Sequence, residues 1–281
     1  MFITLILLIN FLAFSCQANP ISKEDQIILS RFWKFAEKQQ LQNKSHHERA
    51  IEIAKYFIGT PYKSNTLNSD NNEKLIVNLR EFDCVTFVEN VLALTFLPDY
   101  NDRSIDIFLK NLQKIRYRHG IIKDYTSRMH YSTDWLYEMQ QNNVLYDITQ
   151  KLGGIPFEKD ICFMTQFSNK YKVLASNPSL VKEMKNIEKD INAREYFYLP
   201  KVNISKKYQQ INSGDILLIT TSIKNLDTSH IGIALKKGKD VYLLHASSTN
   251  KKVSITTLPL EEYMSNIKSQ SGIIVARIIQ N

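Results

Sequence analysis

Three side chains of this 281-residue sequence have the types that nucleophilic catalysis needs, namely Cys84, His230 and His245. Asp83 precedes the cysteine, and the apolar residues that follow recur at helical spacing. We therefore predict that a helix begins at Cys84 with Asp83 as its N-cap. The unpaired backbone N–H groups and the dipole at that end of a helix favour an anion, so we expect a lowered thiol pKa. Such a cysteine becomes a catalyst when a base lies beside it.

The two histidines stand where an antiparallel hairpin would bring them together. His230 opens one β-branched run and His245 closes the next, eight residues before and seven residues after Gly238. A turn at Gly238 would make them cross-strand neighbours with Cβ atoms about 5 Å apart. One would face the thiol as base while the other orients it. The alternative is a zinc site made from the same three side chains, but the paired cysteine spacing typical of zinc sites is missing.

The predicted secondary structure that must position these residues changes along the chain from helices to strands. Helical patterns come first and short β-branched runs come later, which is the order of an α+β domain whose helical layer packs on one face of an antiparallel meander. The predicted helices cover 21–41, 45–59, a stretch from Cys84, 103–115, a stretch from Ser132, and 180–194. The predicted strands cover 216–220, 231–235, 241–244, 253–257 and 273–279, and 144–173 reads as loop and short strand.

The N-terminal segment predicts export. Residues 1–18 open with an apolar run from Phe2 to Phe14 that is too short to span a bilayer and then turn polar, which is typical of a signal peptide. Cleavage after Ala18 and lipidation of Cys16 are both compatible with the sequence, and an uncleaved anchor is the alternative. We predict an N-terminal helical extension over 19–44 and one domain over 45–281, located in the periplasm or cell envelope, with a membrane-anchored lipoprotein as one form.

The composition is that of an ordinary globular domain, with 43% hydrophobic residues and a formal net charge of +8. A basic protein suits an anionic surface such as a bacterial envelope, or nucleic acid. Because Lys is scattered rather than clustered beside aromatic residues, we predict no nucleic-acid binding. Cys84 and Cys162 are the cysteines that remain if the first 18 residues are removed, so apolar burial must supply the core.

The sequence resembles the NlpC-type papain-like cysteine peptidases that cut bacterial peptidoglycan, and within them the N-acetylmuramoyl-L-alanine amidase-like subfamily. The matching motifs are Gly59-Thr60-Pro61-Tyr62, Phe82-Asp83-Cys84-Val85-Thr86-Phe87-Val88, Arg128-Met129-His130-Tyr131-Ser132-Thr133-Asp134-Trp135, Ser213-Gly214-Asp215-Ile216-Leu217, Ser229-His230-Ile231-Gly232-Ile233 and His245-Ala246-Ser247. The more usual members have Asp-Cys-Ser at the nucleophile, and Val85 takes the serine position here.

The resemblance implies a papain-like domain that hydrolyses the amide between N-acetylmuramic acid and L-alanine. Cys84 would attack the carbonyl, His230 would move the proton, and His245 would orient His230. The Cys84 N–H and the Tyr62 hydroxyl would hold the oxyanion, and Asp83 would cap the helix. The alternatives are a γ-D-glutamyl-diamino acid endopeptidase, a wall-binding lipoprotein without catalysis, and an acyltransferase.

The resemblance also suggests how the substrate is held. Residues 116–135 are rich in Arg, His, Tyr and Trp, a mixture typical of ligand-facing loops, although an aromatic loop packed on the core would look the same. The implied substrate-binding residues are Arg128, His130, Tyr131, Asp134, Trp135, Ser229 and Ser247. The partners would be peptidoglycan fragments, with no metal and no cofactor, and we expect a monomer.

Overall fold

The computed structural model of the protein describes residues 21–67 and 72–280. The predicted signal segment and Cys16 lie outside these residues. Within the described ranges no helix is both long and apolar enough to cross a membrane. The helices are α1 (Lys23–Lys38), α2 (His46–Tyr56), α3 (Cys84–Thr95), α4 (Ile105–Arg116), α5 (Ser132–Gln141), α6 (Phe163–Gln166), α7 (Lys172–Ala175), α8 (Pro178–Asn192) and α9 (Leu260–Ser265). The strands are β1 (Leu145–Asp147), β2 (Ile155–Pro156), β3 (Phe197–Pro200), β4 (Ile216–Thr221), β5 (Thr228–Lys237), β6 (Asp240–Ser247), β7 (Lys252–Ile255) and β8 (Gln270–Ile278).

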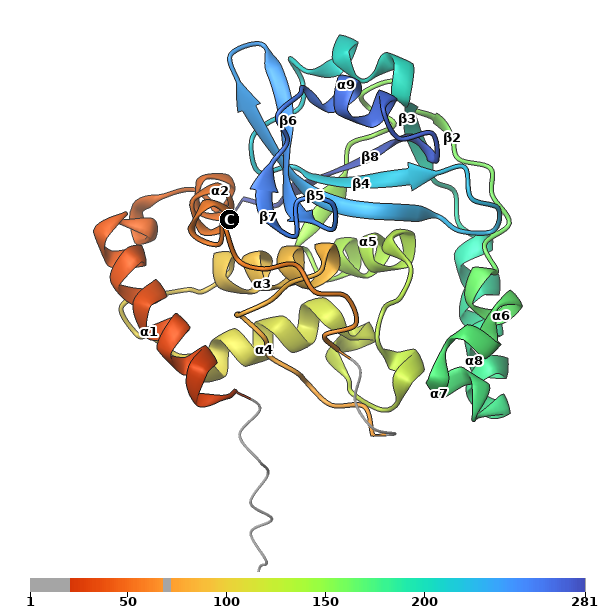
Figure 1. The fold of residues 1–281 in the computed structure, drawn as a ribbon, viewed down its shortest axis with the longest axis horizontal. Helices are drawn as coiled ribbons and strands as arrows, with labels where there is room; N and C mark the ends of the chain where they lie inside the picture. The colour runs from red at the N-terminus through yellow and green to blue at the C-terminus, as the bar shows by residue number, and fades with distance from the viewer. Residues whose placement is uncertain (1–20, 68–71, 281) are drawn as a thin grey trace, which may run out of the picture.

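The α+β class is confirmed, with helices packed against an antiparallel sheet (Figure 1). Its strand order is β2-β3-β8-β4-β5-β6-β7, and β1 also pairs with β8. The run from β4 to β7 is the predicted meander. The last strand departs from that meander, because β8 returns to the far side of β4 instead of joining β7.

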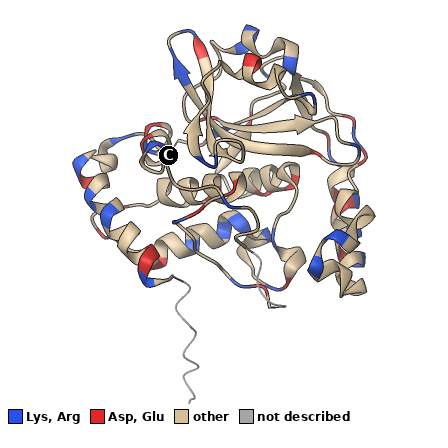
Figure 2. Cartoon of the chain, in the orientation of Figure 1, with Lys and Arg blue, Asp and Glu red and all other residues tan. Residues whose placement is uncertain are grey.

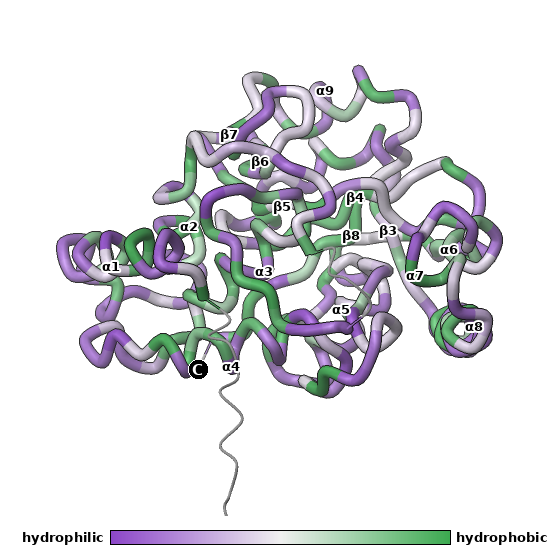
Figure 3. Tube along the Cα trace, turned by 60° about the horizontal axis from the view of Figure 1, so that its bottom comes forward, coloured by the Kyte–Doolittle hydropathy of each residue, from purple (hydrophilic) through white to green (hydrophobic). Residues whose placement is uncertain are grey.

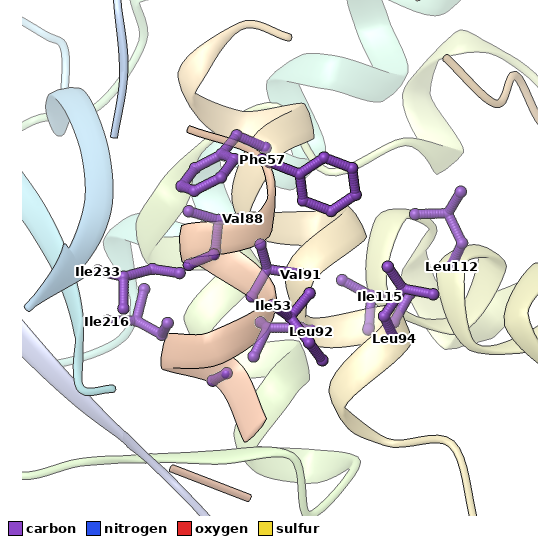
Figure 4. Close-up of a cluster of buried hydrophobic side chains, with 14 of the residues drawn as sticks. Ile53, Phe57, Val88, Val91, Leu92, Leu94, Leu112, Ile115, Ile216 and Ile233 are labelled. Carbon is purple, nitrogen blue, oxygen red and sulfur yellow. The ribbon is translucent and has the colours of Figure 1, made fainter. Parts of the chain in front are cut away.

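Helix α3 is the centre of the hydrophobic core. Every residue from Thr86 to Thr95 is buried, so this helix is enclosed on all sides rather than amphipathic. Figure 4 shows its valine and leucine side chains between Ile216 and Ile233 of the sheet and Leu112 and Ile115 of α4. The first residue of α3 is Cys84, so the buried core fixes the helix that carries the thiol.

The second face of the sheet is also covered, which differs from the prediction of a helical layer on one face. Leu217, Ile219 and Leu243 point away from α3 and pack with Leu260 and Met264 of α9. Figure 3 shows hydrophobic stretches in β4 and β8 near the middle of the molecule, and hydrophilic ones along the outer helix α1. The short α9 carries too weak a pattern to be read from the sequence, since six residues make less than two helical turns.

The predicted N-terminal extension shares the main core. Phe32 and Trp33 of α1 are buried in the cluster that contains α3. The buried carboxylate of Asp25 accepts a hydrogen bond from the backbone N–H of Leu79 at 2.8 Å, and Arg80 Nε lies 3.2 Å from it. Helix α1 therefore anchors the segment that leads directly to the start of α3.

Candidate active site

The N-terminus of α3 is held by a reciprocal cap, as the sequence predicts. The carboxylate of Asp83 accepts hydrogen bonds from the backbone N–H and the hydroxyl of Thr86, both at 2.8 Å. In return the Thr86 hydroxyl accepts the N–H of Asp83 at 3.0 Å. These bonds satisfy helix-end groups that would otherwise be unpaired. They also leave Cys84 as the first helical residue, with its backbone N–H close to its own sulfur.

The thiol of Cys84 does not have the lowered pKa that its place on the helix predicts. Cys84 is half-buried, and the protein atoms packed around the sulfur raise its pKa to about 12 because burial disfavours the thiolate. The Asp83 carboxylate adds to this shift. The backbone N–H groups of Ile231, Cys84 and Val85 oppose it. In this geometry desolvation outweighs the helix dipole, so the resting cysteine is a neutral thiol.

A split between β5 and β6 lets the start of α3 reach the backbone of β5. The ladder between these strands ends at Ile233 and Leu244. Beyond that point β5 continues along β4, and β6 continues along β7. The Ile231 N–H therefore has no partner strand on its β6 side, and it points to the sulfur of Cys84 instead. This donor was missed by sequence reasoning, because nothing in the local sequence marks where two strands separate.

The two histidines meet diagonally rather than directly across the strands. Lys237 pairs with Asp240, so the register places His245 opposite Gly232, two residues from His230. Diagonal neighbours on one face still touch when their side chains are long or aromatic. Nε2 of His230 lies 2.5 Å from Nδ1 of His245, and the rings are nearly perpendicular at 87°. The predicted association of the pair is present, with its register corrected by two residues.

Burial keeps both imidazoles neutral. It lowers the pKa of His230 to about 4, and it lowers the pKa of His245 further because a protonated His230 would repel a second charge. His245 is 1% exposed, and its ring lies 5.7 Å from the ring of Tyr263 on α9. His245 is thus fixed from the α9 side of the sheet, while the sulfur of Cys84 reaches Ile231 from the α3 side.

Gly232 makes room for this arrangement. A Cβ atom at Gly232 would lie 2.8 Å from Leu243 Cδ1 and 3.0 Å from the Cβ of His245. A side chain at this position would therefore require Leu243 to turn away and His245 to shift. A glycine inside a strand is itself a sequence signal of close approach, and it stands two residues after His230 in the printed sequence.

Tyr62 lies near Cys84. The backbone of Lys63 donates to the Phe82 carbonyl and that of Phe82 donates to the Pro61 carbonyl, which ties the Tyr62 segment to the residues before Cys84. The pKa of the Tyr62 hydroxyl is raised by burial and then by the nearby Cys84 and Asp83. Its neutral hydroxyl is therefore placed to donate a hydrogen bond near the sulfur.

Most of the predicted substrate-binding segment has internal partners. Arg128 forms an ion pair with Glu73 at 3.6 Å, and its guanidinium lies 5.1 Å from the ring of Tyr125. His130 bonds the Tyr125 carbonyl at 2.8 Å, and burial lowers its pKa to about 3. The Tyr131 hydroxyl donates to Glu188 at 2.7 Å.

Asp134 and Trp135 are engaged in the same way. The carboxylate of Asp134 accepts from Arg118 and Arg194, and Trp135 Nε1 donates to the Ile115 carbonyl at 3.0 Å. Both side chains are buried, at 1% and 4% exposure. A role in binding substrate stays a prediction for this segment, and its contacts favour the alternative of an aromatic loop packed on the core.

The predicted serines flank the histidines. Ser229 is exposed at the bulge where the β4 and β5 register shifts, next to His230. Ser247 is buried at the end of β6, and its hydroxyl accepts the N–H of Asn250 at 3.0 Å. Of the two serines, Ser229 is therefore the one that solvent or a ligand can contact. Across the part of the chain that the structure describes, no group of three or more His, Cys, Asp or Glu side chains is placed to hold a metal ion.

Comparison with known proteins places this arrangement in a family. A family model described as AmiA-like, N-acetylmuramoyl-L-alanine amidase-like, matches residues 52–273. A solved N-acetylmuramoyl-L-alanine amidase from Bacteroides uniformis is 37% identical with a TM-score of 0.80, over 83% of this chain and 99% of that chain. A Bacteroides fragilis structure described only provisionally as a xylanase is also 37% identical, with a TM-score of 0.77, over 81% and 100% of the two chains.

A more distant structure has the same fold. A Legionella pneumophila protein of the DUF1460 family model is 21% identical with a TM-score of 0.69, over 92% of this chain and 96% of that chain. No curated protein matches the sequence. The family model spans the segment from α2 to β8 and includes Cys84, His230 and His245. The chain therefore belongs to the N-acetylmuramoyl-L-alanine amidase-like family.

Proposed function

We propose that this protein hydrolyses the amide between the lactyl group of N-acetylmuramic acid and L-alanine in peptidoglycan fragments, through a Cys-His-His centre. One observation carries the proposal: the sulfur of Cys84 receives the N–H of Ile231, the residue that follows His230 in the chain, and His230 is hydrogen-bonded to His245. The helix-start cysteine and the strand histidines are also the features that motivate an NlpC-type, papain-like relationship.

Because the Cys84 thiol and the His230 ring are both neutral at rest, the proton is transferred between them during the reaction. His230 takes the thiol proton as the sulfur attacks the carbonyl, rather than waiting as half of a preformed ion pair. The carbonyl oxygen becomes an oxyanion, stabilised by the Cys84 N–H and the Tyr62 hydroxyl. His230 then returns the proton to the leaving L-alanine nitrogen, and a thioester remains on Cys84. Water, deprotonated by His230, hydrolyses the thioester and restores the thiol.

His245 orients the base. Because Nε2 of His230 faces His245, its other ring nitrogen remains for the thiol proton. The burial of His245 supplies a fixed partner whose ring cannot turn into solvent. This assigns His245 a positioning role, as the third member of a triad.

Product analysis tests the bond that is cut. Mature protein incubated with a defined muropeptide should release a peptide that begins with L-alanine, which mass spectrometry identifies directly. Products cut between D-glutamate and the diamino acid would instead support the endopeptidase alternative. Binding of the muropeptide with no product would support the wall-binding alternative, and transfer to an added amine would support the acyltransferase.

The pH profile should follow the lowered pKa of His230. This histidine is a base only when neutral, and burial keeps it neutral down to pH about 4. We expect kcat/KM to stay level from pH about 7 to about 5 and to fall roughly tenfold per unit below about 4. Circular dichroism at each pH separates this loss from acid unfolding. A midpoint near the ordinary histidine value of about 6.5 would contradict a buried base.

Export and membrane attachment belong to the same proposal. The proposed substrate lies in the cell envelope, and the apolar run from Phe2 to Phe14 within residues 1–18 suits a signal segment. Figure 2 shows Lys and Arg at positions along α1, α4 and α8. Fractionation of cells that express the full chain, compared with Cys16→Ser, tests the anchor. Release of that variant from the membrane fraction is expected if Cys16 is lipidated, and unchanged fractionation would contradict lipidation.

A further inference from the structure

A buried carboxylate lies just before the strand that carries His230. The side chain is that of Asp227, which is 1% exposed. Its oxygens accept the backbone N–H and the hydroxyl of Thr133 at 2.8 and 3.0 Å, and the backbone N–H of Thr228 at 2.7 Å. A buried carboxylate is costly unless such donors surround it, so Asp227 and its partners hold one another in place.

Asp227 caps helix α5 from outside that helix. Thr133 is the second residue of α5, and Tyr131 at the N-cap position makes no side-chain bond to the helix end. The Asp227 carboxylate supplies that bond instead. The next residue adds a second link, because the Thr228 hydroxyl donates to the Ser132 hydroxyl at 2.6 Å. Asp227 and Thr228 are therefore both tied to the first turn of α5.

Strand β5 has a bulge between these bonds and His230. Ile219 of β4 pairs with His230, whereas the next residue, Thr220, pairs with Thr228, so Ser229 is the extra residue of the bulge. Residues two apart on a regular strand share one face of the sheet. Here Thr228 bonds α5, on the α3 side of the sheet, whereas His230 lies opposite Ile219, which packs with α9 on the other side (Figure 1). The bulge is what lets Thr228 and His230 point toward opposite faces.

The strand split makes His230 depend on this bulge. Across the residues that the structure describes, the ladder between β5 and β6 starts at Ile233, three residues after His230. At His230 the backbone is therefore held from the β4 side, by Ile219. Its other support comes from the preceding residues, which Asp227 ties to α5. The opening at which Cys84 meets β5 thus leaves the direction of the His230 side chain dependent on how its N-terminal neighbours are fixed.

We propose that Asp227 is a positioning residue, which fixes the direction of the His230 imidazole through the bulge at Ser229. The inference rests on the proposed function, in which His230 is the base. Asp227 acts through the backbone of β5 and does not contact the substrate in this role. Loss of its bonds should leave substrate binding intact and slow the proton transfer, because a displacement of about 1 Å in a catalytic group lowers its rate strongly.

Asp227→Asn tests this role, because asparagine keeps the size of the side chain and replaces one acceptor oxygen by a donor. We expect kcat for a defined muropeptide to fall about tenfold, with KM changed by no more than about twofold. Asp215→Asn is the matched control, since Asp215 is a buried carboxylate immediately before β4 that pairs with Arg277 at 2.7 Å. The control should lose stability in denaturant unfolding and keep kcat within about twofold. Equal losses of kcat in both variants, or full kcat in Asp227→Asn, would overturn the proposal.

Thr133 offers a pair of variants that perturb the fold less. Thr133→Val keeps the shape of the side chain and removes the hydroxyl that donates to Asp227, whereas Thr133→Ser keeps that donor and loses a buried methyl group. A positioning role predicts that kcat falls about threefold in Thr133→Val, while Thr133→Ser loses stability at unchanged kcat. If kcat instead follows stability in both variants, Asp227 serves the fold alone and the proposal is wrong.

A measurement without substrate separates this inference from the proposed reaction. In nitrogen-15 NMR spectra of the free protein, the ring resonances of His230 report its hydrogen bond to His245, which spans 2.5 Å. We expect Asp227→Asn and Thr133→Val to shift these resonances, and Asp215→Asn and Thr133→Ser to leave them in place. Unmoved His230 resonances in Asp227→Asn would overturn the positioning role whatever bond the enzyme cuts. Shifted resonances in a protein that shows no turnover would support the positioning role and contradict the proposed function.

Discussion

Cys84→Ala should reduce kcat/KM for muropeptide hydrolysis by at least about 10³-fold, because it removes the thiol that forms the acyl intermediate in the proposed mechanism. The fold should remain, since the cap that starts α3 uses Asp83 and Thr86 rather than the thiol. Steady-state kinetics with a defined muropeptide gives the loss, and circular dichroism checks the fold.

Cys162→Ala is the matched control for that substitution. Cys162 is the other cysteine that the structure describes, and it is also half-buried, at the start of the short helix α6. We expect its loss to change kcat/KM by no more than about twofold. Comparable losses for both variants would indicate damage to the fold, and full activity of Cys84→Ala would refute the thioester mechanism.

Glycoside hydrolysis is the other chemistry that a structural relative suggests, and the site argues against it here. Glycosidases that follow the common mechanism place two carboxyl groups on either side of the bond. At the start of α3 the carboxylate is that of Asp83, and it is occupied by the N–H and hydroxyl of Thr86. The proposed Cys-His-His centre would instead carry out acyl transfer, so we expect substitution of Cys84 to abolish the activity.

Local chemistry made the helix starts readable from the sequence. Asp83 before Cys84, and Ser45 with Glu48 in the next helix upstream, form reciprocal caps within three residues, and such signals need no tertiary information. The same holds for β4 to β7, whose β-branched runs and intervening turns are short-range features. These elements were predicted because each is decided by its own residues.

Features that depend on distant segments were not predicted. The return of β8 beside β4 is decided by which strand edge remains open, and the two-residue offset between His230 and His245 is decided by where the turn is centred. The short helices α6 and α7 lie in a segment read as loop and strand, because four residues carry too little periodicity. Each of these outcomes is fixed by packing partners far along the chain.

The pKa of Cys84 illustrates the same limit in electrostatics. The helix dipole is visible in the sequence and favours the thiolate, whereas the protein atoms that surround the sulfur are not visible and favour the thiol. The aromatic and charged segment from Arg128 to Trp135 is a second case. Its composition suggested a ligand surface, while Glu188 and the Ile115 carbonyl supply partners from inside the protein. Composition alone does not show whether the side chains of such a segment bind a ligand or other residues inside the protein.

Gly232→Ala should reduce kcat about 10²-fold, the second largest effect we expect. The new Cβ would lie 3.0 Å from the Cβ of His245 and 2.8 Å from Leu243 Cδ1, so the strands must move apart or His245 must shift. A displacement of about 1 Å in a catalytic group is enough for a loss of this size. The overpacking should also cost about 1–3 kcal/mol of stability, measured by denaturant unfolding.

Gly238→Ala in the same hairpin separates the two effects. Gly238 has φ +61° and no atom within 4 Å of an added Cβ, so alanine there strains the backbone without touching a neighbour. We expect it to lose about 1–2 kcal/mol of stability with kcat nearly unchanged. If Gly232 acts by positioning His245, the two variants will be similarly destabilised and only Gly232→Ala will lose turnover, with KM little altered. If both variants lose kcat in proportion to their loss of stability, Gly232 is needed only for the stability of the strand. The pair of His230 and His245 would then tolerate a displacement that the proposed mechanism does not allow.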